Sequence, residues 1–116
     1  NWKQSDMNRL WVGEDGNGKE RHFKIEDHHF WDLITTNQLK VSIVDTITVQ
    51  WAYQGTERRP KKIKVLRVLD FNGEKLSDPL DDGALDAILG TYAVSDAQRS
   101  RARHKPDQSG QLQMDV

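Results

Sequence analysis

The sequence predicts a mainly β domain with short helices: a small curled antiparallel sheet or partly open five-stranded barrel, with an inserted helix and a short C-terminal helix. Most apolar residues lie in short runs that alternate with polar residues, as strands with one buried face require. Asp-Gly and Asn-Gly pairs separate several of these runs, which favours antiparallel hairpins. The 116 residues suffice for one modest core and are too few for two.

A single small domain is expected over residues 8–94, because no repeat or low-complexity segment divides this stretch. Residues 1–7 are interpreted as a linker or a tag remnant. Residues 95–116 carry several arginines and few apolar side chains, so a flexible basic and polar tail is expected there.

The first two strands are expected at residues 8–12 and 19–25. An Asp-Gly pair followed by an Asn-Gly pair lies between them and supplies positive φ at little steric cost, so the two strands should form a hairpin. In the second strand Phe23 and Ile25 alternate with polar neighbours, which gives the strand one apolar face.

A short helix is expected over residues 27–36, between the second and third strands. Asp27 is a suitable N-cap, and Asn37 ends the apolar stripe. The stripe should close one side of the core, and it consists of Phe30, Trp31, Leu33 and Ile34.

Residues 45–53 form the clearest strand pattern in the chain. Ile47, Val49, Trp51 and Tyr53 alternate with smaller or polar residues, so they should share one face. That face is expected to point inward.

Two further strands and a helix are expected after residue 60. Residues 63–71 are apolar on both sides, which predicts a central or sharply curled strand. An Asn-Gly turn leads into a short edge at 74–76, and residues 81–89 predict a small helix with Gly90 at its C′ position.

Taken together, the core positions between residues 23 and 71 resemble those of a small β-barrel domain of uncharacterised bacterial proteins. The resemblance implies a barrel fold and an accessory role, and it implies no catalytic residue. Val44 departs from it, because such barrels often enter the following strand through a glycine. The positions that carry the resemblance are Phe23, Ile25, Asp27, Phe30, Trp31, Ile34, Leu39, Asp45, Ile47, Val49, Gln54, Val65, Leu66, Val68 and Leu69.

Composition excludes several classes of protein. A formal net charge of −1 lacks the global basic excess of a protein that coats nucleic acid, although a local patch remains compatible with it. The chain has no cysteine, so it can hold no disulfide, thiolate metal site or cysteine nucleophile. No apolar run approaches the length of a membrane span, and the cytoplasm is the default expectation. No motif calls for a cofactor.

The charges of the chain are strongly segregated. Residues 57–67 hold six cations against Glu57, a net charge of +5, whereas residues 69–86 hold six acids against Lys75, a net charge of −5. The sequence therefore predicts a dipolar surface. Its predicted binding residues are Arg58, Arg59, Lys61, Lys62, Lys64 and Arg67.

Three functions are compatible with this pattern. The leading hypothesis is a non-catalytic binding or assembly module of a larger bacterial protein, whose charged surface contacts another protein or a second copy. The alternative is a nucleic-acid-binding small barrel that uses the basic hairpin and an exposed ring such as Trp11, although Trp51 and Tyr53 are expected to point inward. The plain interpretation of the same hairpin is a solvated turn whose lysines discourage edge aggregation.

A metal-dependent enzyme is the third hypothesis. His28 and Asp32 are spaced i and i+4, which puts both on one face of a helix, and His22 is close enough in sequence to complete a three-ligand site. The same spacing also suits a surface hydrogen-bonded pair.

Overall fold

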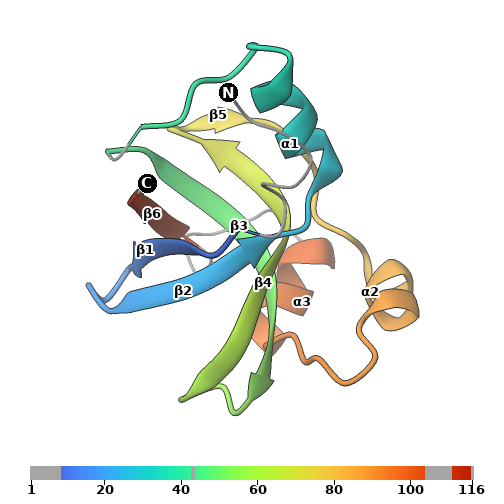
Figure 1. The fold of residues 1–116 in the computed structure, drawn as a ribbon. Coiled ribbons are helices and arrows are strands. Elements are labelled where there is room, and N and C mark those ends of the chain that lie inside the picture. The colour runs from blue at the N-terminus through green and yellow to red at the C-terminus, as the bar shows by residue number, and fades with distance from the viewer. Residues whose placement is uncertain (1–8, 43, 104–110, 116) are drawn as a thin grey trace.

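The computed structural model describes residues 9–42, 44–103 and 111–115 (Figure 1). In chain order its elements are β1 (Trp11–Asp15), β2 (Glu20–Ile25), α1 (His28–Thr35), β3 (Thr46–Gly55), β4 (Pro60–Phe71), β5 (Glu74–Lys75), α2 (Asp82–Ile88), α3 (Asp96–Arg103) and β6 (Gln111–Asp115).

The strands form one sheet in the order β2-β1-β6-β3-β4-β5. Neighbours in this order are antiparallel, and an additional parallel pairing of β2 with β4 curls the sheet back on itself. The result is a small, partly open barrel of five strands, with the two-residue strand β5 added at the edge of β4 (Figure 1). The predicted mainly β fold is confirmed.

The main core fills the inside of this barrel, and α1 covers one end (Figure 1). Asp27 caps α1 as predicted, and Phe30, Trp31 and Ile34 of the helix are buried. The indole Nε1 of Trp31 donates to the carbonyl of Ile25 at 2.8 Å, which fixes the helix against the end of β2.

A second apolar cluster lies on the outer face of β3 and β4, where α2 and the segment after it pack. Both faces of β3 are therefore buried over much of its length, although the alternating sequence suggested only one. Asp81 caps α2, and Gly90 follows the helix with φ of 57°, as the C′ prediction requires. The buried residues of this cluster are Ala52, Leu66, Leu85, Leu89 and Val94.

The C-terminal prediction is wrong in part. Residues 95–116 were expected to form a flexible tail, but they contain α3 and β6, and Gln98 of α3 is buried. β6 pairs with both β1 and β3, so it supplies the fifth long strand of the barrel. These contacts are backbone pairings between strands distant in sequence, and amino-acid composition does not reveal them. The predicted linker 1–7 lies outside the described residues, as do 104–110.

The boundaries of two strands differ from the predicted ones. The first strand begins and ends three residues later than predicted, because the turn is restricted to residues 16–19 by the Asp15 carboxylate, which accepts from the amides of Asn17 and Lys19. The predicted edge at residues 74–76 is shorter in the structure. No helix among the described residues is long and apolar enough to cross a membrane.

Candidate binding surface on the β3–β4 hairpin

The β3–β4 hairpin extends beyond the barrel wall. β2 pairs with β4 at Ile63 to Val65, and β6 pairs with β3 at Thr46 to Thr48. The last backbone pairing of β3 with a segment other than β4 is the bridge between Tyr53 and Ala93, and the side chain of Gln54 still contacts Thr91. Within the described chain, residues 54–62 thus form a two-stranded end without a third strand, which we call the hairpin tip. It points away from α1 (Figure 1).

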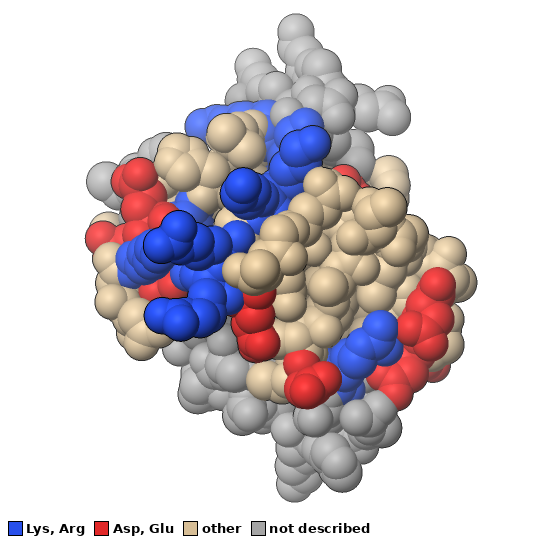
Figure 2. Space-filling view, turned by 90° about the horizontal axis from the view of Figure 1, so that it is seen from below, with Lys and Arg blue, Asp and Glu red and all other residues tan. Residues whose placement is uncertain are grey.

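The hairpin tip carries four exposed cations that make no ion pair within the described residues. The single acid among them is Glu57. Figure 2 looks onto this end of the molecule and shows most of its Lys and Arg side chains gathered on one part of the face, with several Asp and Glu side chains beside them and a broad uncharged surface next to the group. The four cations are Arg58, Arg59, Lys61 and Lys62.

A defined turn holds the two arginines. Gly55 has φ of 84°, and a Cβ atom there would lie 2.9 Å from the carbonyl oxygen of Arg59, so only glycine fits. The amide of Arg59 donates to the backbone and hydroxyl oxygens of Thr56, each at 3.1 Å. The sequence pattern did not single out Gly55 or Thr56 as turn residues. A glycine two residues after the strand pattern was the available signal.

Lys62 lies at a β-bulge where the tip joins the barrel. The register changes from Ala52 opposite Lys64 to Gln54 opposite Lys61, so β4 has one extra residue there, and Lys62 has φ of 50°. A residue with a Cβ atom is strained in this left-handed region. This backbone strain at Lys62 lowers the stability of the fold.

We expect Lys62→Gly to stabilise the fold by about 1 kcal/mol, since glycine adopts this φ without the Cβ clash. Urea denaturation of the variant and the parent protein measures the difference. The matched control is Lys61→Gly, which removes the same charge from a regular strand position and should destabilise by roughly 0.5–1 kcal/mol. Equal effects of the two substitutions would show that the backbone at Lys62 is not strained.

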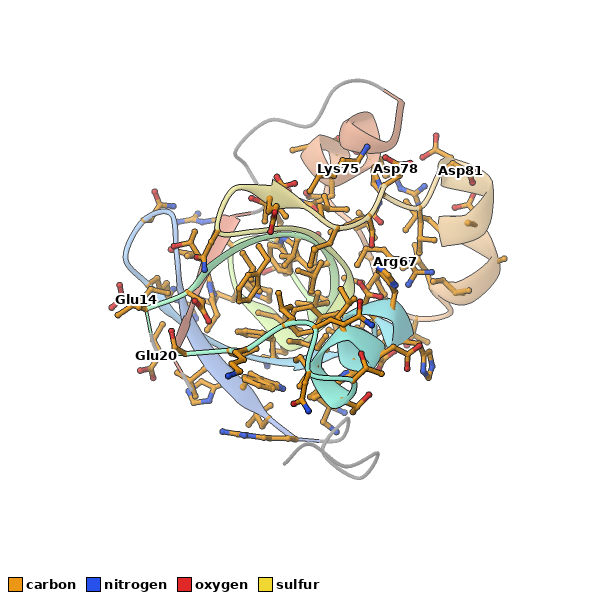
Figure 3. All side chains as sticks on the ribbon, turned by 90° about the horizontal axis from the view of Figure 1, so that it is seen from above. Glu14, Glu20, Arg67, Lys75, Asp78 and Asp81 are labelled. Carbon is orange, nitrogen blue, oxygen red and sulfur yellow. The ribbon has the colours of Figure 1, made fainter. Side chains whose placement is uncertain are left out.

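Two of the six predicted binding residues lie elsewhere. The ammonium of Lys64 is 3.7 Å from Glu26 and 4.0 Å from the centroid of the Tyr92 ring. A guanidinium nitrogen of Arg67 donates to the carbonyl of Leu66 at 2.7 Å, and Figure 3 shows Arg67 on the side of the barrel near α2. The structure therefore separates Lys64 and Arg67 from the exposed tip.

The aromatic side chains near the hairpin offer no exposed stacking platform. Trp11 is 1% exposed, so the prediction of an exposed ring there is wrong. Tyr53 belongs to the core, as expected, and Trp51 packs against the same core. Burial raises the pKa of Tyr53, and the nearby acids Glu57 and Asp96 raise it further, so its phenol is neutral at physiological pH.

The acidic segment, residues 69–86, has less unpaired negative charge than the sequence suggests, because cations of the same chain contact three of its acids. Lys75 contacts Asp78 at 2.7 Å, and Arg99 contacts Asp82 at 3.4 Å and Asp86 at 3.0 Å. The hydrogen bond to Asp78 raises the pKa of Lys75, and that to Asp86 raises the pKa of Arg99. Figure 3 shows Lys75, Asp78 and Asp81 together on the side of the molecule that bears α2.

The histidines do not come together as a metal site. His22 lies on β2 and is 3.2 Å from Glu20, while His28 and Asp32 lie on α1. Residues 9–42, 44–103 and 111–115 contain no group of three or more His, Asp or Glu side chains that could hold a metal ion. The proposed three-ligand site of His22, His28 and Asp32 is therefore wrong.

Comparison with known proteins adds no family. A scan against protein-family models, a search of curated proteins and a search of solved structures each found no match to this chain. The resemblance to a small bacterial β-barrel domain stays a prediction.

Proposed function

We propose that this domain is a non-catalytic binding module that uses the hairpin tip to contact an anionic partner. The observation that carries the proposal is the set of four exposed cations on a protruding two-stranded end, with no ion pair in the described chain. Unneutralised cations on a convex surface create a local positive potential, which attracts an anionic surface and orients it.

Self-association through the acidic segment is a weaker form of the same idea. In that form the tip of one copy would meet the acids between residues 69 and 86 of another. Arg99 and Lys75 already contact three of these acids, so a second copy would have to compete with intramolecular pairs. The charge pattern therefore favours a different molecule as the partner.

The test is retention on immobilised heparin, a generic polyanion. We expect the parent protein to be retained despite its net negative charge, because the cations of the tip are concentrated in one place. The variant R58Q/R59Q/K61Q should elute at lower salt. Circular dichroism confirms that it is folded.

The matched control is K19Q/K24Q/K40Q, which makes the same change in net charge at exposed positions outside the tip. This control should elute close to the parent protein. If the two triple variants shift equally, the retention reports net charge alone, and the tip is not a binding surface. A parent protein that passes through unretained also overturns the proposal.

A further inference from the structure

We infer that the anionic partner is duplex DNA and that the hairpin tip enters its major groove. This inference rests on the proposed function, because it names the partner of the same surface. It follows from the shape of the tip, from the side chains that the tip lacks, and from the burial of the nearby aromatic rings.

The shape of the tip matches a groove rather than a flat surface. It is a two-stranded antiparallel ribbon, and the major groove of B-form DNA, about 12 Å wide, admits such a ribbon. The turn lies three residues beyond Ile63, the first residue of β4 that pairs with β2. At roughly 3.3 Å per residue the tip projects about 10 Å beyond β2, comparable with a groove depth of about 8.5 Å, and on the β3 side Thr91 contacts it at Gln54.

The composition of the tip disfavours a protein partner. Stable protein interfaces are built around buried apolar or aromatic anchors and are depleted of lysine. The large apolar side chains exposed in the described residues are Leu10, Val44 and Ile88, all outside residues 54–62. Interfaces with nucleic acid are more polar and far more positively charged, which is the character of this tip.

The burial of the aromatic rings distinguishes duplex from single strand. Proteins that bind single strands stack bases on exposed aromatic side chains. Tyr53 and Trp11 are buried, Trp51 is half-buried against the core, and the half-buried ring of Tyr92 is covered by the Lys64 ammonium, so none of these rings is an exposed stacking surface. Duplex RNA fits less well than duplex DNA, because the major groove of A-form RNA is too narrow for side chains to read.

The geometry of the turn holds the two arginines in place before DNA binds. The Thr56 hydrogen bonds and the close approach at Gly55 hold Arg58 and Arg59 at the leading end of the ribbon. Arginine binds phosphate oxygens through two parallel hydrogen bonds, so a fixed turn reduces the entropy lost on binding. Lys61 and Lys62 follow at the base and reach the flanking phosphates as point charges.

The experiment is fluorescence anisotropy of the full chain with a labelled DNA duplex of about two helical turns. Four neutralised phosphates predict a slope of log affinity against log salt of about −3.6. R58Q/R59Q/K61Q should lower the affinity on the order of tenfold or more at low salt and flatten the slope, whereas K19Q/K24Q/K40Q should change neither substantially. Unlabelled single-stranded DNA, duplex RNA and polyglutamate serve as competitors.

Each outcome has one interpretation. Duplex DNA should compete best. If polyglutamate or single-stranded DNA competes equally well while the tip variant still loses heparin retention, the tip binds anions but the assignment to duplex DNA is wrong. If duplex RNA competes equally, the major-groove geometry is wrong. If heparin retention does not depend on the tip, the proposed function itself fails.

Discussion

Replacing Asp27 by alanine is expected to lower the free energy of unfolding by about 2–4 kcal/mol. Asp27 is 1% exposed and joins α1 to β4. One carboxylate oxygen accepts from the amide of Phe30 at 3.3 Å and caps α1, and the other accepts from the amide of Val68 in β4 at 2.7 Å. The substitution removes a helix cap and also leaves a buried strand amide without its acceptor.

Asp81→Ala is the matched control for this prediction. Asp81 also caps a helix, α2, and accepts from the amide of Ala84 at 2.8 Å, but it is exposed and has no hydrogen bond to a strand among the described residues. Its replacement should cost only about 1 kcal/mol. Urea denaturation measures both variants. If Asp27→Ala costs no more than Asp81→Ala, the bond to Val68 does not stabilise the junction between α1 and β4.

The parts of the fold that were predictable are those encoded by local pattern. The Asp27 cap, the apolar stripe of α1 and the alternation of Ile47 and Val49 depend on residues near one another in sequence, and all are found in the structure. The positive φ of Gly90 at the end of α2 is likewise a local requirement.

The parts that were missed depend on long-range pairing. β6 alternates Leu112 and Met114 with polar residues, a strand pattern hidden in a largely polar tail, and it becomes a strand because β1 and β3 offer it unpaired backbone on both sides. Buried Gln98 has the same origin, since its side-chain oxygen accepts from the amide of Trp51, at an edge position that β6 does not reach. Neither partner lies close in sequence, so the local pattern did not reveal which strands β6 and Gln98 would contact.

For a related reason, the sequence predicted where the cations of the candidate surface lie in the chain but not which of them are paired. A run of cations can be counted in the sequence, but which of them remain without an ion pair depends on the fold. Glu26 and Tyr92, which are far apart in sequence, both contact Lys64. Arg58 and Arg59 instead lie in the turn between β3 and β4, beyond the residues that pair with β2. The same reasoning applies to the acids that Arg99 contacts from α3.

Gln50→Leu is expected to destabilise the fold by about 2–4 kcal/mol, although it replaces a polar residue in a buried site by an apolar one of similar size. The amide of Gln50 makes two bonds to one residue: its oxygen accepts from the backbone amide of Leu80 at 2.8 Å, and its nitrogen donates to the Leu80 carbonyl at 3.0 Å. The side chain thus fixes the segment that leads into α2. Leucine would leave both backbone groups without these partners.

Gln54→Leu is the matched control, because Gln54 lies on the same strand and its amide nitrogen donates to Thr91 at 2.7 Å in an exposed position. Solvent can replace that bond, so a change within about 0.5 kcal/mol is expected. Urea denaturation gives both values, and hydrogen exchange reports the Leu80 amide directly. Faster exchange at Leu80 in Gln50→Leu, without a comparable change in Gln54→Leu, is the expected result. Unchanged stability and exchange would mean that α2 is held by the apolar contacts of Leu85 and Leu89 alone.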